Sequence, residues 1–166
     1  MARLKELIIE NYDEIKHKND VLYIADNLRN QDKEELKACG YNEALAVILS
    51  SLNGAGISFL VKSVDHKPLC VFGISSHKDN DLGTPIWFLS VDCIDEYRKE
   101  FIYYAGQVVK LWVENFGKLY NYVSVENTKS VRWLKRLGAK FSEPILYGAN
   151  GALFMRFTIG GDEYVC

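Results

Sequence analysis

The sequence predicts an α/β fold: a single domain over residues 1–166, with a mixed central sheet of about seven strands and about four to five helices. A continuous apolar run, Ile86–Val91, is followed by a long amphipathic helix and a second strand, which is the order of a parallel crossover. Pairs of strand-like runs within 57–76 and 140–159 are joined by short turn-forming clusters. Each pair predicts an antiparallel hairpin, so the sheet is expected to have antiparallel ends around a parallel centre.

The N-terminal part of the chain is expected to be largely helical. Apolar residues at helical spacing predict an amphipathic helix over residues 3–17, although Leu7–Ile9 is also compatible with a short strand. Val21–Ala25 is apolar throughout and predicts a first core strand. Residues 29–38 then predict a polar helix. Residues 42–54, which run from an Asn cap to a closing Asn-Gly, predict an apolar and well-buried helix.

From Ile57 onward the apolar pattern changes from the helical period to that of strands. We expect residues 1–20 to be an N-terminal extension or helix, and residues 160–166 to be a short tail. The elements expected between these ends are strands at 57–64, 69–76 and 86–91, a helix capped by Asp95 and ended by Gly117, a strand at 119–125, a helix that Gly138 ends, and strands at 140–147 and 152–159.

The segment Glu126–Ala139, ENTKSVRWLKRLGA, predicts a short basic helix with well-defined ends. Asn127 or Thr128 can cap its first turn, and Gly138 can take the left-handed conformation that ends a helix. Charge alone favours a solvated surface helix. Its apolar stripe consists of Val131, Leu134 and Leu137.

Composition excludes several classes of protein. The net charge of −2 argues against attraction of the whole protein to nucleic acid or to an anionic membrane. No apolar run reaches the ~20 residues that a membrane-spanning helix needs. The first residues, MARLKELIIENYDEIK, carry charges inside their apolar pattern, which is not typical of a secretory signal.

The cysteines and histidines predict neither a metal site nor a disulfide framework. None of the four cysteines forms a CxxC pair, and the three histidines have no ligand spacing. Reduced cysteines in a cytoplasmic compartment are therefore expected. The residues concerned are Cys39, Cys70, Cys93, Cys166, His17, His66 and His77.

Two segments together resemble the GNAT-type N-acyltransferases: IWFLSVD with the helix after it, and YVSVENTKSVRWLKRLGAKF. The second has the family's order of a strand, an Asn, a small residue three positions on, an aliphatic–bulky pair and a Leu-Gly before an aromatic strand. The resemblance in element order covers roughly residues 20–160. ADNLRNQDKEEL, CVFGI, IWFLSVD and SVRWLKRLGAKF are similar to GNAT-like proteins encoded beside the internal virion proteins of short-tailed bacteriophages. The matched positions in the second segment are Asn127, Ser130, Val131, Trp133 and Leu137-Gly138.

The resemblance implies an enzyme that transfers an acetyl group directly from acetyl-CoA to an amine, which includes amines on a host protein. It also implies a second reading, a non-catalytic protein of the virion or a protein that binds a host partner. The location would be the host cytoplasm or the virion, a host or phage protein would be the partner, and a homodimer is compatible with the sequence. Nucleic acid is not favoured, although the basic run at 129–140 is a weak alternative.

Two carboxylates are candidate catalytic bases, Asp92 and Glu126, because they follow neighbouring strands whose carboxyl ends would form the ligand crevice. The alternatives are a loop or cap residue for Asp92 and a surface carboxylate for Glu126. The resemblance assigns cofactor contacts to Val91, Cys93, Arg98, Lys99, Asn127 and Ser130.

The sequence also departs from the family pattern at three positions. Phe101 and Tyr103 stand where the family has the glycines of its pyrophosphate loop, and side chains there would obstruct close approach of the backbone. Leu134 stands where the family has a tyrosine that acts as the acid, and leucine cannot donate a proton. These departures weigh against ordinary catalysis.

Overall fold

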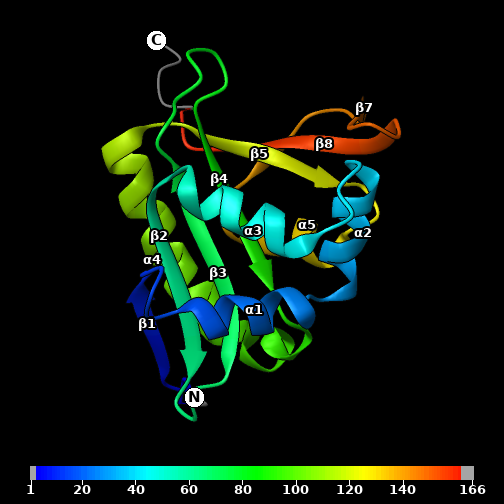
Figure 1. Ribbon diagram of the computed structural model, residues 1–166. Helices are drawn as coiled ribbons and strands as arrows, with labels where there is room; N and C mark the ends of the chain where they lie inside the picture. The colour runs from blue at the N-terminus through cyan, green and yellow to red at the C-terminus, as the bar shows by residue number, and fades with distance from the viewer. Residues whose placement is uncertain (1–2, 162–166) are drawn as a thin grey trace.

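A computed structural model describes residues 3–161 of the chain (Figure 1). The elements in these residues confirm an α/β fold with a mixed sheet. They are, in order, β1 (Leu7–Asn11), α1 (Lys18–Asp26), α2 (Asn30–Ala38), α3 (Ala44–Asn53), β2 (Ala55–Ser63), β3 (Pro68–Ser75), β4 (Thr84–Ser90), the 3-10 helix η1 (Asp92–Tyr97), α4 (Arg98–Phe116), β5 (Leu119–Ser124), α5 (Thr128–Arg136), β6 (Lys140–Phe141), β7 (Ile145–Tyr147) and β8 (Ala152–Ile159).

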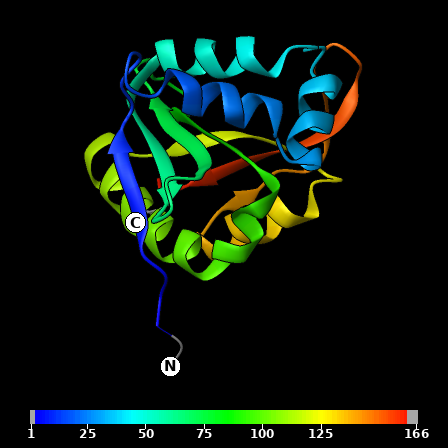
Figure 2. The same cartoon turned by 60° about the horizontal axis from the view of Figure 1, so that its bottom comes forward.

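The strands form one sheet in the order β1-β2-β3-β4-β5-β8-β6, with β7 also paired to β8. Helices cover both faces: α1 and α3 lie over one, and α4 and α5 over the other (Figure 2). Apolar clusters hold these layers together, and two of the three in residues 3–161 lie between the helices and the sheet as follows. Residues of α1 and α3 pack on β2 and β3 in the first, and residues of α4 and α5 pack on β3, β4, β5 and β8 in the second.

The neighbours β4 and β5 are parallel, whereas the other paired strands of residues 3–161 are antiparallel. The pairing of β4 with β5 is confined to the beginnings of the two strands, where Thr84 is opposite Leu119 and Pro85 is opposite Tyr120. Beyond that point β4 follows β3 and β5 follows β8, so the two strands separate toward their carboxyl ends (Figure 1). The Asn121 amide, which donates from Nδ2 to the carbonyl oxygen of Ile86 over 2.6 Å, lies where the separation begins.

Two predictions for the N-terminal part were wrong. Val21–Ala25 lies in helix α1 and not in a strand: Val21 and Ile24, three residues apart, are buried, while Leu22 and Tyr23 are 38% and 37% exposed. A short apolar run does not distinguish a strand from a helix by its periodicity. The helix predicted over 3–17 is absent, because Leu7–Asn11 pairs with β2 as a strand, the alternative that the sequence left open.

Several helix ends differ in detail from the prediction. Helix α3 begins at Ala44 with Glu43 before it, so Asn42 is not the cap. Only Ile48 and Leu52 of this helix are buried, which is less than its apolar composition predicted. Asp95 is not a cap either, since it lies inside η1 and α4 begins at Arg98.

Other predicted features are confirmed. The Asn127 side chain caps α5 by accepting the N–H of Ser130 over 3.2 Å, and Gly117 follows the last residue of α4. Both antiparallel hairpins form, one from β2 and β3 and the other from β7 and β8. Cys166 and part of the predicted tail lie outside the described residues. Within residues 3–161, no helix combines the length and the apolar character needed to cross a membrane.

Candidate functional site

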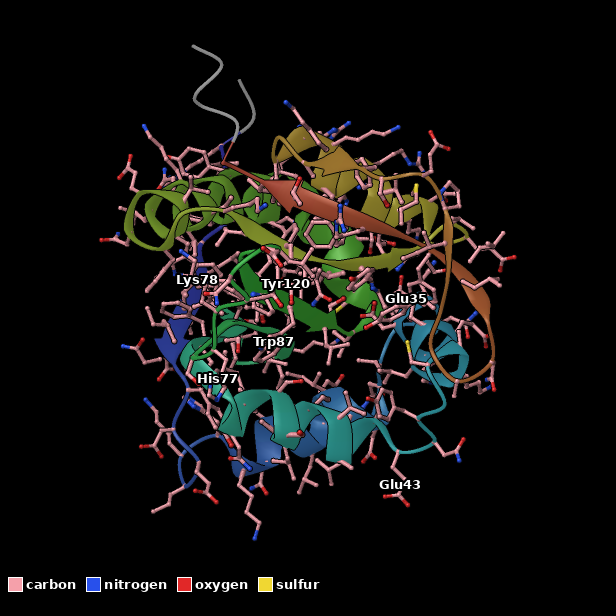
Figure 3. All side chains as sticks on the ribbon, turned by 90° about the horizontal axis from the view of Figure 1, so that it is seen from above. Glu35, Glu43, His77, Lys78, Trp87 and Tyr120 are labelled. Carbon is pink, nitrogen blue, oxygen red and sulfur yellow. The ribbon has the colours of Figure 1, made fainter. Side chains whose placement is uncertain are left out.

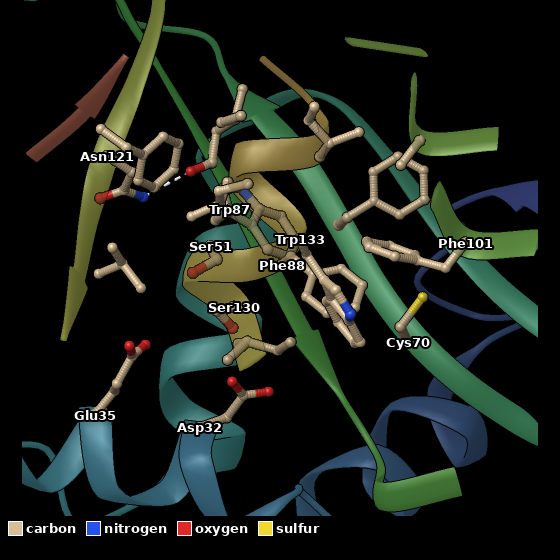
Figure 4. A pocket seen from close by; sticks show the side chains of 18 of the residues that line it. Asp32, Glu35, Ser51, Cys70, Trp87, Phe88, Phe101, Asn121, Ser130 and Trp133 are labelled. Carbon is tan, nitrogen blue, oxygen red and sulfur yellow. Dashed lines mark hydrogen bonds between the residues drawn. The ribbon is translucent and has the colours of Figure 1, made fainter. Parts of the chain in front are cut away.

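A cavity of about 350 Å³ opens where β4 and β5 separate (Figure 4). Trp87, Phe88 and Leu89 of β4 form one wall, and Asn121–Val123 of β5 form the opposite wall. The lining continues to α3 on one face of the sheet and to α4 on the other, so the cavity passes through the gap between the two strands. We call this cavity the β4–β5 cleft. The lining is mostly apolar, which is typical of ligand sites with a few polar groups that fix orientation.

Helix α2 and Arg29, the residue just before it, supply the charged groups of the β4–β5 cleft. Arg29, Asp32 and Glu35 recur at intervals of three residues, which places them on one side of the helix, and all three line the cleft. Figure 4 shows the Asp32 and Glu35 carboxylates extending from α2 toward the space beside Ser130. Figure 3 shows Glu35 lying between α3 and the β5–β8 side of the molecule.

Arg29 and Asp32 form a buried pair in the lining of the cleft, and each residue is 2% exposed. Arg29 donates from Nη2 to Asp32 Oδ1 over 2.9 Å and to Ser130 Oγ over 2.7 Å. Its guanidinium carbon lies 5.0 Å from the centre of the Trp133 ring. Asp32 Oδ2 accepts the backbone N–H of Ser90 over 3.1 Å, so the pair fixes α2 against both β4 and α5. Burial raises the pKa of Asp32 despite the neighbouring Arg29.

Glu35 is a partly exposed carboxyl group of the cleft. Its Oε1 accepts the backbone N–H of Ser124 and the Nδ2–H of Asn127, each over 2.9 Å. Burial raises the pKa of Glu35 to about 7, and these two hydrogen bonds lower it only in part. A partly exposed carboxyl group with a pKa near neutral pH can both take up and release a proton under cellular conditions.

A second cavity of about 590 Å³ meets the first at Glu35. It is formed by α2, by the turn between β5 and α5, and by the turn between β7 and β8. Three carboxylates line it, from Glu34, Glu35 and Glu126, against the single ammonium group of Lys37. Glu35 therefore lies between an apolar cleft and a polar cavity with an excess of negative charge.

The residues predicted as ligand contacts on α5 lie beside the cleft. Ser130 lines the cleft, and its Oγ accepts a hydrogen bond from Arg29. Asn127 is 3% exposed, and its side chain both caps α5 and donates a hydrogen bond to Glu35. Glu126 is exposed and lines the polar cavity instead. The structure thus brings Asn127, Ser130 and Glu126 close to Glu35, which sequence reasoning did not select.

The other predicted contacts gather around the connection between β4 and α4. Val91 is buried, and its N–H donates to the Leu69 carbonyl oxygen over 3.0 Å. Cys93 is partly buried, and Asp92, Arg98 and Lys99 are exposed. The structure places none of Val91, Asp92, Cys93, Arg98 and Lys99 in the lining of the β4–β5 cleft. Arg98 and Lys99 begin α4, where a helix N-terminus favours anions.

Two of the three positions that depart from the family pattern, Phe101 and Leu134, pack against buried residues in this structure. Phe101 is 4.6 Å from Phe88 and 4.8 Å from Trp133, measured between ring centres. Tyr103 is 50% exposed on α4, and Leu134 packs in the apolar cluster between α5 and the sheet. Phe101 and Leu134 thus stabilise the core that forms the floor of the cleft.

Sequence reasoning missed Arg29, Asp32 and Glu35 because the segment RNQDKEEL has the composition of a solvated helix. The signal that could have found them is their spacing of three residues next to the apolar anchors Leu28 and Leu36. In residues 3–161, no group of three or more His, Cys, Asp or Glu side chains is placed to hold a metal ion.

The raised pKa of Glu35 predicts that the protein loses stability as the pH rises. The folded state holds the Glu35 proton up to about pH 7, whereas the unfolded chain releases it near the ordinary value of 4.5. The unfolded state therefore binds fewer protons between these values, and the free energy of unfolding falls across the window. The free energy of unfolding of Glu35→Gln, measured relative to that of wild type, should therefore increase by on the order of 2–3 kcal/mol between pH 4.5 and pH 8.

Urea denaturation at a series of pH values measures this difference. Glu34→Gln is the matched control, because the Glu34 side chain is 61% exposed on the same helix. If the Glu35→Gln protein kept the pH dependence of wild type, Glu35 would not be the group responsible.

Comparison with known proteins shows a match of part of the chain to one family model, and a similarity of the whole fold to solved structures. The family model described as "Bacteriophage T7, probable scaffold protein Gp13" matches residues 68–145, from the first residue of β3 to the first residue of β7. No curated protein sequence matches the chain.

Solved structures with the same arrangement of elements are acetyltransferases. Spermidine N-acetyltransferase from Vibrio cholerae, in complex with CoA and spermine, is 14% identical with a TM-score of 0.63, over 96% of this chain and 98% of that one. An acetyltransferase of the GNAT family from Bacillus anthracis is 12% identical with a TM-score of 0.65, over 97% and 98% of the two chains. A dodecameric structure of the Vibrio cholerae enzyme is 14% identical with a TM-score of 0.60, over 96% of each chain. The resemblance seen in the sequence is confirmed: the chain has the fold of the GNAT acetyltransferases, and its central part matches a family of phage proteins.

Proposed function

We propose that the protein is an N-acyltransferase that transfers an acyl group from an acyl-CoA thioester, such as acetyl-CoA, to an amine. The observation that carries this proposal is the position of Glu35, a carboxyl group with a pKa raised to about 7, where the apolar cleft meets the polar cavity. A base at such a junction is reached by one reactant from each side.

The residues of the β4–β5 cleft fit the arm of coenzyme A. The walls are apolar and open at the carboxyl ends of two parallel strands, where α/β sheets place their ligands. Two buried side chains of the cleft region, Arg29 and Ser90, carry polar atoms that have no hydrogen-bond partner within residues 3–161. These atoms suit the acyl carbonyl oxygen at the reacting end of the arm. The phosphates would lie near Arg98 and Lys99 at the start of α4, because η1 supplies no glycine for a backbone cradle.

Each reactant group then has a partner in the protein. Coenzyme A supplies the acyl group as a thioester. Glu35 removes a proton from the substrate ammonium, which leaves the nitrogen lone pair free to bond to the acyl carbon. As that bond forms, the carbon–sulfur bond breaks and its electron pair leaves on the sulfur, and the resulting thiolate takes up the second proton that the nitrogen loses on becoming an amide. Glu34 and Glu126 attract the cationic amine into the polar cavity. Asp92 and Glu126 remain the other proposed proton acceptors.

Binding of acetyl-CoA or CoA is the first test. At 100 times the dissociation constant, a ligand that binds only the folded state stabilises it by about 2.7 kcal/mol. We expect both compounds to raise the midpoint of thermal unfolding and to give a calorimetric binding signal. Adenosine, which has neither phosphates nor an arm, serves as the control compound. The absence of a shift and of a signal with both CoA compounds would contradict the proposal.

A second candidate function is a non-catalytic role in phage assembly or in binding a host protein. It is favoured by the match of residues 68–145 to a probable scaffold protein of bacteriophage T7. The residues in the glycine and tyrosine places, Phe101 and Leu134, also favour it, because both are packed in the core. Recovery of the protein from purified virions, or bound to a host protein, without turnover of acetyl-CoA would support this second function. Turnover by the isolated protein together with its absence from virions would exclude it.

A further inference from the structure

Arg29 has hydrogen-bond donors that nothing in the described chain uses. The residue is 2% exposed, and its Nη2 donates to both Asp32 and Ser130. Its Nε and Nη1 are also buried, yet neither has a hydrogen-bond partner within residues 3–161. Together they carry three N–H groups of a charged side chain. Leaving such donors unpaired in a buried place is unfavourable, so they mark a position where an oxygen atom is expected to bind.

The backbone donors around the end of β4 are already occupied. The N–H of Ser90 donates to Asp32 Oδ2, and the N–H of Val91 donates to the carbonyl oxygen of Leu69. Leu28 also forms an isolated antiparallel bridge with Val91, so the segment before α2 lies along this end of the strand. A carbonyl oxygen that reaches Arg29 in the cleft therefore meets free N–H groups on this side chain and not on the backbone of Ser90 or Val91.

We propose that Arg29 binds the acyl carbonyl oxygen of the thioester and stabilises the negative charge that this oxygen gains during transfer. The inference rests on the proposed acyltransferase function. As the amine nitrogen bonds to the acyl carbon, the electron pair of the carbon–oxygen π bond shifts onto the oxygen and returns when the thiolate leaves. The free N–H groups of Arg29 donate to that oxygen while Glu35 holds the proton taken from the amine. Prepositioned donors of this kind contribute much of the rate enhancement in acyl transfer.

The neighbours of Arg29 hold it in position for this role. Asp32 and Ser130 fix Nη2, and the rings of Phe88 and Trp133 lie 5.8 Å and 5.0 Å from the guanidinium carbon. Asp32 and Ser130 are therefore positioning residues. Because Nε and Nη1 are enclosed in this structure, side chains over them must shift when the acyl group binds, as side chains in binding sites commonly do.

The carbonyl stretching band of acetyl-CoA labelled with carbon-13 at the carbonyl group reports directly on this hydrogen bond. With wild-type protein we expect the band of the bound compound to lie at lower wavenumber than in water. In Arg29→Met, which has a side chain of similar length without N–H donors, the shift should be lost while CoA, which has no acyl group, binds equally well. Turnover should fall about 10²–10³-fold with little change in KM. In Ser130→Ala, which keeps the free donors, the band should stay shifted.

The outcomes separate the two proposals. If wild-type protein binds acetyl-CoA with no shift of the carbonyl band, the role of Arg29 is overturned and the acyltransferase proposal stands. That result needs no variant, so it holds even if Arg29→Met fails to fold. An equal shift in wild type and in folded Arg29→Met also overturns the role of Arg29. If wild type binds neither acetyl-CoA nor CoA, both proposals fail.

Discussion

Replacing Glu35 with glutamine is expected to lower the turnover number for acyl transfer by about 10²–10⁴-fold, the range that a lost general base costs. Glutamine keeps the oxygen that accepts from Ser124 and Asn127, so the fold and the cleft should remain intact. What it loses is the ability to take a proton. Acetyl-CoA affinity should therefore change little, and the measurement is the rate of CoA release with a panel of mono-, di- and polyamines.

The pH dependence of the same reaction gives a second readout. In wild type, kcat should rise with pH and level off above about 7, where Glu35 is ionised. This rise should be absent in the residual activity of Glu35→Gln. The control, Glu43→Gln, changes an exposed carboxylate that lines neither cavity and should keep the wild-type profile. Turnover of Glu35→Gln within about threefold of wild type would exclude Glu35 as the base.

Replacing Trp133 with alanine is expected to lower the free energy of unfolding by about 3–5 kcal/mol, as large-to-small changes of buried aromatic residues do. Trp133 is 5% exposed and lies against the rings of Phe88 and Phe101, at 5.9 Å and 4.8 Å between ring centres. Its ring also packs on the Arg29 guanidinium. Alanine would leave a cavity where α5, β4 and α4 meet. We therefore expect the loss of stability to be accompanied by less tightly packed side chains in the lining of the cleft.

Urea denaturation measures the effect on stability. The control is Leu111→Ala on α4, where the leucine is 56% exposed and should cost no more than about 0.5 kcal/mol. A cost below about 1 kcal/mol for Trp133→Ala would contradict the assignment of Trp133 to the core beneath the cleft.

The sequence predicted best those elements whose apolar period is unambiguous. The alternating run in β8, the turn cluster between β2 and β3, and the capped helix after Asn127 were all recovered. Helix α1 was mistaken for a strand because five successive apolar residues fit both structures, and only contacts with distant elements decide between them. Strand β1 depends likewise on its pairing with β2, which no local pattern specifies.

The site was predicted less well than the fold, for a physical reason. The rule that ligands lie at the carboxyl ends of parallel strands led to Asp92 and Glu126, neither of which lines the cleft between β4 and β5. The rule could not reveal that α2 lies across those ends. Charged residues on an inward-facing side of a helix are of the same residue types as those on a solvated side. Arg29 and Glu35 can therefore be identified as cleft residues only once the position of α2 against β4 and β5 is known.

A crystal structure of the wild-type protein with acetyl-CoA tests the central claim most directly. We predict electron density for the arm in the cleft between β4 and β5, with the acyl group beside Glu35 and Arg29 and the phosphates near Arg98. Density for acetyl-CoA elsewhere on the surface, or an empty cleft at saturating acetyl-CoA, would contradict the claim that this cleft is an acyl-transfer site.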